Sequence, residues 1–278
     1  MSKKNDNLST VKNLIWAAGI LLSLAAVFVG FLYAAFGDYY YERVIPTVEL
    51  GASEKAEKSE DKGGKETSSE DNGPIAGELN ELKKKKGGND YISSLYFLCD
   101  STYSSIYLYG ADPSKVWFGE TGVLDAGTLS TGKIIFPDDG SSVTAANAAM
   151  ISFPDILVIM AGSDGLAAVE GGNFKEDYSA LIEGILSLSP DTQIICCSIN
   201  SPAASYAASD GLTSSMIDSA NAWLKEVCTE HAVWYADTAS VICKDGYLIS
   251  EYAGSDGRTL NGAGIEEVLE YLNSHALK

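Results

Sequence analysis

Short apolar runs alternate with helical patterns along the last two thirds of the chain. Nearly continuous apolar runs, typical of buried strands, lie at residues 95–99, 115–118, 156–161, 193–199 and 233–236. Segments with helical spacing separate them, at residues 141–152, 173–187, 213–230 and from about 263 onward. Strands and helices that alternate in this way form a parallel sheet with helices on both faces. We therefore expect a three-layer α/β/α domain built on a mostly parallel, five-stranded, flavodoxin-like sheet.

The N-terminal pattern is different, because residues 13–37 contain no charged side chain. The apolar run 14–36 is long enough to cross a bilayer core of about 30 Å. Lysines before it and acidic residues after it predict a cytoplasmic N-terminus, residues 1–12, and an extracellular remainder. A cleaved signal peptide is the alternative, but its apolar region is shorter and a convincing cleavage site is not evident. We expect a single-pass signal anchor, a transmembrane helix in the cell membrane.

After a short juxtamembrane segment, residues 50–90 are rich in Lys, Glu, Ser and Gly and poor in apolar side chains. Such a composition offers little burial to offset the entropy that folding costs. We interpret residues 38–90 as a juxtamembrane segment and a disordered linker, so the folded domain is expected at residues 91–278. The lysine run 83–86 is able to contact an anionic wall polymer, although a solvated linker is the simpler interpretation.

The predicted domain is strongly acidic. Residues 91–278 contain seven Lys and Arg against 24 Asp and Glu, a net charge of −17. Nucleic-acid binding needs the opposite sign, so a nucleic-acid partner is excluded. The five cysteines show no CxxC spacing and the chain has only two histidines, so we expect neither a zinc site nor a cofactor.

The end of the first predicted strand is the strongest candidate for chemistry. Asp100, Ser101 and Thr102 follow the apolar run 95–99 and begin a predicted helix. In a parallel sheet, ligands bind at the carboxyl ends of the strands. Ser101 is therefore placed to act as a nucleophile, although an ordinary helix cap is the simpler role for a serine at such a turn.

Four short blocks resemble the SGNH/GDSL hydrolase family over residues 92–277. Asp100-Ser101 matches two residues of its Gly-Asp-Ser block, and Gly122, or alternatively Gly119, matches the glycine of the second block. The Gly-x-Asn-Asp block corresponds to residues 162–165, and the Asp-x-x-His block to residues 256–259. The resemblance implies a serine esterase fold that acts on ester or O-acyl carbohydrate substrates, with catalytic residues Ser101 and Asp256.

The chain departs from the family pattern at two positions that the chemistry needs. Asp164 stands where the family has an asparagine that donates to the oxyanion, and an ionised aspartate would repel that charge. Thr259 stands where the family has the histidine base, and threonine accepts no proton near neutral pH. His231 and His275 belong to predicted element ends that lie far from Ser101.

We therefore expect an extracytoplasmic protein that is catalytically weakened or inactive, a pseudoenzyme that binds a surface glycan or an acyl-ester ligand. The candidate ligand-binding residues lie at the strand ends and are Asp100, Gly122, Gly162, Ser163 and Asp164. The first alternative is an active O-acyl carbohydrate esterase in which Asp164 serves Ser101 as the base.

Two further hypotheses remain. Asp100-Ser101-Thr102-Tyr103-Ser104 approximates the DxSxS pattern of von Willebrand A-type domains, which would make the chain an adhesion module with a magnesium ion. A membrane-anchored scaffold with a vestigial crevice is the simplest hypothesis.

Overall fold

The computed structural model describes residues 73–206 and 211–277. The predicted cytoplasmic segment 1–12, the predicted anchor 13–37 and the predicted linker as far as residue 72 lie outside the described residues. Within the described part, no helix has the length and apolar character needed to cross a bilayer.

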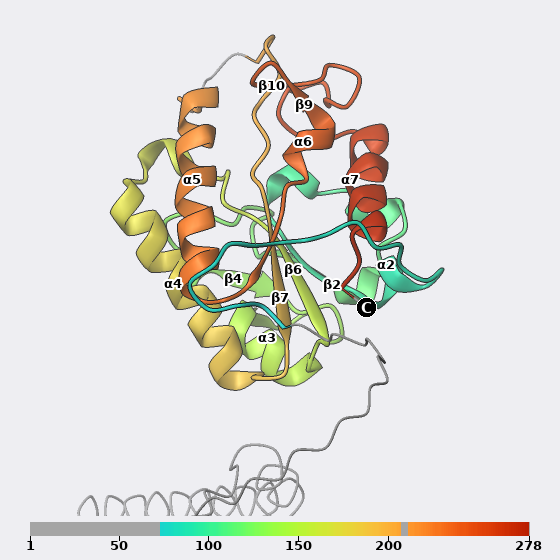
Figure 1. Ribbon diagram of the computed structural model, residues 1–278, viewed down its shortest axis with the longest axis vertical. Helices are drawn as coiled ribbons and strands as arrows, with labels where there is room; N and C mark the ends of the chain where they lie inside the picture. Colours follow the sequence, from blue (N-terminus) through green and yellow to red (C-terminus); the bar gives the residue numbers. More distant parts are fainter. Residues whose placement is uncertain (1–72, 207–210, 278) are drawn as a thin grey trace, which may run out of the picture. The chain divides into compact units, whose positions relative to one another are not determined.

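In the described ranges an eight-stranded mixed sheet forms the middle layer of the domain (Figure 1). Its order is β1-β8-β7-β6-β2-β3-β4-β5, and the neighbours from β1 to β3 pair in parallel, whereas β4 and β5 are antiparallel. The strands are β1 (Asn80–Glu81), β2 (Tyr96–Cys99), β3 (Val116–Gly119), β4 (Lys133–Ile135), β5 (Ser142–Thr144), β6 (Ile156–Met160), β7 (Gln193–Cys197) and β8 (Trp234–Ala236).

Helices cover both faces of the sheet, so the predicted three-layer α/β/α arrangement is confirmed. One face packs against α3 (Ala145–Ser152), α4 (Gly171–Leu188) and α5 (Ser214–Glu230). The other face packs against α2 (Tyr91–Ser94), α6 (Ala239–Ile242) and α7 (Gly262–Ser274). A small antiparallel hairpin of β9 (Cys243–Lys244) and β10 (Tyr247–Leu248) lies apart from the main sheet.

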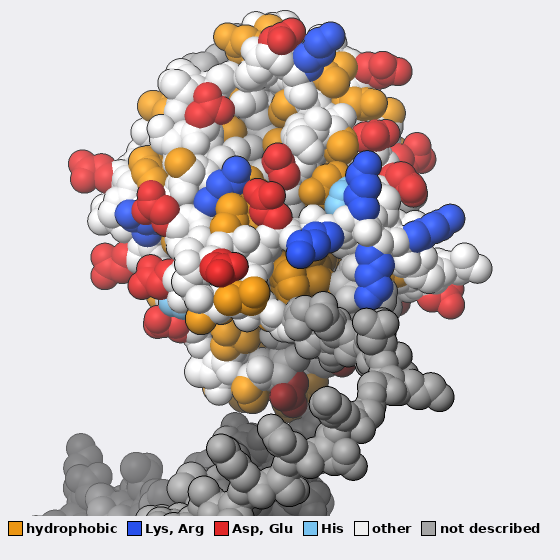
Figure 2. Space-filling view, in the orientation of Figure 1, with side chains coloured by type: hydrophobic (Ala, Val, Ile, Leu, Met, Phe, Trp, Pro, Cys, Tyr) orange, Lys and Arg blue, Asp and Glu red, His pale blue; other side chains and the backbone are white. Residues whose placement is uncertain are grey.

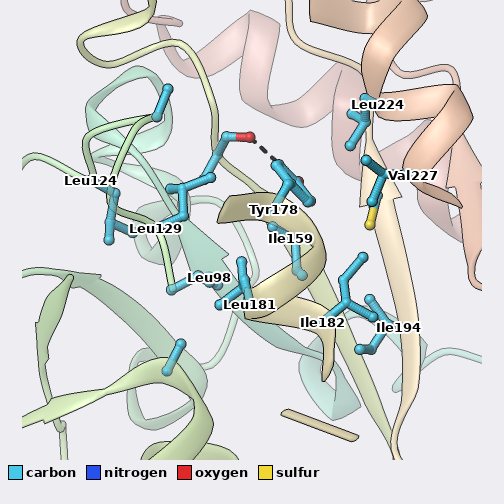
Figure 3. Close-up of a cluster of buried hydrophobic side chains, with 14 of the residues drawn as sticks. Leu98, Leu124, Leu129, Ile159, Tyr178, Leu181, Ile182, Ile194, Leu224 and Val227 are labelled. Atoms are coloured by element: carbon cyan, nitrogen blue, oxygen red, sulfur yellow. Dashed lines mark hydrogen bonds between the residues drawn. The ribbon is translucent and has the colours of Figure 1, made fainter. Parts of the chain in front are cut away.

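The first core cluster shows why the apolar runs become central strands. Leu98, Ile159 and Ile194 of β2, β6 and β7 point toward one face, where Tyr178, Leu181 and Ile182 of α4 cover them (Figure 3). Their neighbours in the strands, such as Phe97 and Val158, point to the opposite face and pack under α7. A strand that is buried on both sides must be apolar at every position, as these runs are.

The sheet differs from the prediction in its number of strands. All five predicted strands are present, but β1, β4 and β5 were not expected. β4 and β5 are three-residue strands with exposed positions, and β1 has only two residues in a polar stretch. The helical pattern predicted from residue 141 therefore begins with β5, and α3 starts at Ala145.

The predicted linker ends earlier than residue 90. β1 pairs with β8, and the N–H of Leu82 donates to the carbonyl of Tyr235 at 2.9 Å. The Leu82 side chain is buried, and the Asn80 side chain bonds Ile75 and Glu78. Backbone pairing, one buried leucine and the bonds of one amide side chain thus hold this segment on the domain, whose described part begins well before Tyr91.

Candidate functional site

Two adjacent strands bring the candidate residues together. β2 and β6 pair in parallel with Cys99 opposite Met160, so the segments that follow them start side by side. Asp100 and Ser101 follow β2, and the loop 162–165 follows β6. The parallel pairing that the apolar runs predicted therefore places Ser101 beside Asp164, as the spacing of the motifs required.

The segment after β2 is not the α-helix that was expected. It forms a 3₁₀ turn over Ser101–Tyr103, and the Asp100 side chain caps this turn by accepting from the N–H of Thr102 at 3.0 Å. Ser104 ends the turn, so no long helix follows to aim several free N–H groups at a ligand. The backbone N–H of this turn that points into the site is that of Ser101, which donates to Asp164.

Asp164 is the centre of the site, because donors from three segments converge on its buried carboxylate. The Ser101 hydroxyl donates to Oδ1 at 2.5 Å, and the Ser101 N–H donates to Oδ2 at 3.1 Å. The N–H of Leu124 also donates to Oδ2, at 3.0 Å. Arg258 Nη2 lies 2.7 Å from Oδ1 and forms an ion pair with it.

The exposure of this ion pair shows which side of it faces solvent. The Asp164 side chain is 2% exposed, whereas the Arg258 side chain is 20% exposed. The guanidinium therefore closes the site from outside, and the carboxylate lies beneath it. A charge-assisted bond of this kind is stronger than a neutral hydrogen bond.

Asp100 belongs to a second buried network, next to the first. Its Oδ2 accepts from the N–H and the hydroxyl of Ser163, at 3.0 and 2.8 Å. The Ser163 hydroxyl also lies 3.0 Å from that of Thr102 and 3.3 Å from Arg258 Nη2. Burial and, after it, the neighbouring Asp164 carboxylate raise the pKa of Asp100, although the bonds from Ser163 and Thr102 oppose this.

Glycines at both ends of the loop 162–165 hold it in place. Gly162 and Gly165 have positive φ angles of 129° and 69°. A Cβ at Gly162 would lie 2.9 Å from Ile199 Cδ1, and one at Gly165 would lie 2.1 Å from Asp125 Oδ2. Only glycine fits both the backbone conformation and the space, which accounts for the glycines in this motif.

Leu124, rather than Gly122, supplies the backbone N–H from the loop after β3. The N–H of Gly122 donates to the carbonyl of Gly119 at 2.7 Å and closes a tight turn, with φ of 78° at Gly122. A Cβ at Gly119 would clash with the carbonyl of Val123, so this turn depends on glycine. Both predicted glycines thus shape the loop that presents Leu124. The sequence did not indicate Leu124, because every residue except proline has a backbone N–H and the residue type does not show which one donates.

Asp256 organises its own loop and makes no bond to Ser101. Its Oδ1 accepts from the N–H groups of Arg258 and Thr259, both at 3.0 Å, and from the Thr259 hydroxyl at 2.9 Å. Partial burial acts to raise the pKa of Asp256, but these hydrogen bonds together lower it. Asp256 thus bonds the fourth residue of its block, Thr259, and it fixes the loop that presents Arg258.

Neither histidine is near Ser101. His231 and His275 follow the last residues of α5 and α7. Helices that cross over a parallel sheet end at the amino ends of the strands, opposite the site. His275 Nδ1 lies 2.8 Å from the carbonyl of Tyr271 in its own helix. The expectation that neither histidine serves Ser101 agrees with these positions.

The space behind the site is small. A cavity of about 10 Å³ lies between the carboxyl ends of β2, β6 and β7, lined by Asp100, Tyr103, Ser163, Ser198 and Asn200 among others. Such a volume holds at most one water molecule. Within residues 73–206 and 211–277, no group of three His, Cys, Asp or Glu side chains is arranged to hold a metal ion. Beside Asp164, the place for a cation is taken by Arg258.

No family model matches this chain, and neither does any curated protein. Similar solved structures include a candidate platelet activating factor from Streptococcus pneumonia, 14% identical over 64% of this chain and 81% of that one, with a TM-score of 0.46. A candidate GDSL-like lipase from Parabacteroides merdae ATCC 43184 is 18% identical over 47% of this chain, which spans 64% of the lipase, with a TM-score of 0.39.

A carbohydrate esterase family 3 protein from Talaromyces cellulolyticus is 11% identical, over 70% of this chain and 95% of that one, with a TM-score of 0.40. These TM-scores are below 0.5, so the chemistry of the site is judged from its own contacts. The solved structures to which this chain is similar thus include proteins described as a GDSL-like lipase, an acylhydrolase and a carbohydrate esterase.

Proposed function

We propose that this chain is a membrane-anchored, extracytoplasmic protein with a GDSL-hydrolase-like domain that binds an acyl-ester or surface-glycan ligand and does not hydrolyse it efficiently. One observation carries the proposal: the Asp164 carboxylate accepts the hydroxyl and the N–H of Ser101 and the N–H of Leu124.

Acyl transfer needs free donors where negative charge develops. The backbone N–H groups of Ser101 and Leu124 are of the right kind, but both already donate to Asp164 Oδ2. A carboxylate therefore occupies the position where an oxyanion would form. Its own negative charge opposes that of the transition state.

The second requirement is a base for the Ser101 proton. The position of the family histidine is Thr259, whose hydroxyl donates to Asp256 and has no basic nitrogen. The Ser101 hydroxyl donates to the Asp164 carboxylate, and the other side chain that bonds this carboxylate is Arg258, whose guanidinium has no proton-accepting nitrogen. The geometry thus supports a site that has lost its catalytic base.

Ligand binding and location are supported by different features. Ser101 and Arg258 are half-buried, so hydroxyl or acyl oxygens of a ligand can reach a guanidinium and a serine at this edge. The uncharged run at residues 13–37 supports a membrane anchor, and the charges around it support an extracellular domain. The net charge of residues 91–278 is against a nucleic-acid partner.

An active serine hydrolase is the second candidate, and the 2.5 Å bond from Ser101 Oγ to Asp164 Oδ1 favours it. In that mechanism the Asp164 carboxylate accepts the hydroxyl proton while the serine oxygen adds to the acyl carbon, whose carbonyl opens to an oxyanion. When the carbonyl reforms, the bond to the alcohol breaks and the proton passes to the departing oxygen, and water then hydrolyses the acyl-serine. The carboxylate would have to leave the two N–H groups, because the oxyanion needs them.

Incubation of the full chain with purified cell-wall glycan that carries O-acyl groups separates the two candidates. The proposal predicts that the glycan sediments with the protein, that Arg258→Met weakens this binding, and that mass spectrometry detects no released acid. Binding no better than to a neutral control polymer would contradict the binding function, and release of acid that Ser101→Ala abolishes would favour the hydrolase.

A further inference from the structure

Four consecutive lysines form an isolated basic strip on this acidic domain. Lys83, Lys84, Lys85 and Lys86 are all exposed. Among residues 73–206 and 211–277, the ion pairs involve Lys175 and Arg258 and none of the four. Lys85 Nζ also donates to the carbonyl of Leu277, at 3.2 Å.

The backbone of the strip is fixed on the domain, unlike that of a solvated linker. Before it, β1 pairs with β8 and Leu82 is buried. Within it, the N–H of Lys85 donates to the carbonyl of Ser274 at 2.9 Å, and the carbonyl of Lys85 accepts from Ala276 at 2.8 Å. The four cations are therefore held together, and little backbone entropy is lost when they meet a partner.

The sign of this strip is opposite to that of the domain behind it. Residues 91–278 carry a net charge of −17, whereas the strip contributes four positive charges in a row. On the face drawn in Figure 2, several Lys or Arg side chains lie around a histidine, and acidic side chains are scattered over other parts of that face. An extended anionic surface attracts the strip and repels the acidic remainder of the domain. The domain should therefore contact such a surface in one orientation, with the strip facing it.

We propose that the strip Lys83–Lys86 docks the domain onto anionic lipid headgroups of the membrane that holds the N-terminal anchor. The inference rests on the proposed anchoring, which would tether the chain to the bilayer at residue 37. Residues 38–72 separate this tether from the described domain, and 35 residues span at most about 120 Å, so the strip would remain within reach of the bilayer surface. Each lysine near an anionic surface adds to the attraction.

A lipid surface fits better than a free polymer because of this proximity. A tether converts binding into an intramolecular step with a high effective concentration of headgroups. A soluble polyanion has no such advantage and must overcome the repulsion of the acidic domain in every other orientation.

The test uses the full chain in nanodiscs of neutral lipid or of neutral lipid with a third of anionic phosphatidylglycerol. An amine-acylating reagent labels exposed lysines, and mass spectrometry reports the rate at each one. We expect labelling at Lys83, Lys84 and Lys86 to be roughly tenfold slower in anionic nanodiscs at low salt and to recover in high salt. The exposed Lys133 and Lys244 serve as internal controls whose rates stay equal.

Charge-matched variants test whether the strip itself is responsible. Lys84→Glu/Lys86→Glu should lose the protection at Lys83, whereas Lys133→Glu/Lys244→Glu, with the same net charge, should keep it. Equal labelling of the strip in both lipids would overturn the inference, and so would stronger protection by soluble polyphosphate than by anionic lipid. Failure of the chain to enter nanodiscs at all would instead contradict the proposed anchoring.

Discussion

Asp164 determines what this edge of the sheet can do. Its carboxylate accepts hydrogen bonds from Ser101, Leu124 and Arg258, which come from three separate segments. An asparagine in this place would present an amide donor, as the resemblance implies for the family. One atom of difference, oxygen in place of nitrogen, thus replaces attraction for an oxyanion by repulsion.

The variant Asp164→Asn/Thr259→His is expected to gain ester hydrolysis. Asparagine would restore a donor and histidine a base, and the bond from Thr259 to Asp256 shows that a side chain at 259 reaches the aspartate. An oxyanion donor and a general base each contribute about a hundredfold to the rate of acyl transfer. A gain of at least tenfold over the wild type is therefore expected with an activated ester.

Ser101→Ala in the same double variant is the control for this gain, and Thr259→Ala/Asp164→Asn tests the need for the histidine. Circular dichroism and thermal unfolding first establish that each protein is folded, since Asp164→Asn removes the ion pair with Arg258. If the double variant is folded and its turnover does not exceed that of its Ser101→Ala form, Asp164 and Thr259 are not what prevents ester hydrolysis at this site.

The raised pKa of Asp100 predicts a pH dependence of stability. A carboxyl whose pKa is raised on folding contributes stability at pH values below its unfolded pKa, about 3.9, and loses it as pH rises through the folded pKa. Asp100→Asn lacks this titration. Denaturant unfolding of both proteins is measured between pH 3.5 and 7. As pH rises, the free energy of unfolding of the wild type should fall relative to that of Asp100→Asn. A difference between the two proteins that does not change with pH would contradict the prediction.

At the scale of elements, the segment 73–90 moves the N-terminal boundary of the folded domain. It adds β1 to the sheet, buries Leu82 and bonds the end of α7 through Lys85. A chain that begins at residue 91 therefore loses an edge strand and leaves the backbone edge of β8 without this partner, including the Tyr235 carbonyl that accepts from Leu82. The folded unit extends further toward the N-terminus than its composition indicates.

Leu82→Ala is expected to lower the free energy of unfolding by about 2 to 3 kcal/mol, because it removes a buried leucine from the core under α7. Lys83→Ala, one residue further on and exposed, should change it by less than about 0.5 kcal/mol. Chemical unfolding of both variants measures the difference. Equal stabilities would mean that residues 73–90 contribute little to the fold.

Sequence periodicity predicted the central elements well because they are buried on both faces. β6 and β7 are apolar at nearly every position, and the helices α4 and α5 have one apolar face. The short strands β1, β4 and β5 escaped prediction because two or three residues show no period. Their positions are set by pairing with a neighbouring strand, which is a tertiary effect.

The site was predictable as far as it depends on side-chain identity and strand order. Asp100, Ser101 and Asp164 meet because two apolar runs pair in parallel. Arg258 and Leu124 were missed for physical reasons. Leu124 acts through its backbone, and Arg258 stands at a variable position of its motif, so only the folded loop shows that it reaches Asp164.

At the scale of the molecule, the part of the chain that the structure describes combines the buried Asp164 carboxylate with an acidic composition and the basic strip Lys83–Lys86. The proposed anchor would hold the domain near a membrane, and the acidic surface would keep it from polyanions except through Lys83–Lys86. Binding at the edge of the sheet and docking through the strip are separate proposals, because the strip follows β1 and bonds the chain at the end of α7, whereas the site lies at the carboxyl end of β2.

The central claim is that Asp164 closes the acyl-transfer site, and hydrolysis of a small activated ester by the full chain tests it most directly. Wild type and Ser101→Ala are compared at neutral pH after both are shown to be folded. The account predicts that the two proteins release product at the same slow rate, within error of each other. Turnover by the wild type that is lost in Ser101→Ala would contradict it and would make Asp164 the base of an active enzyme.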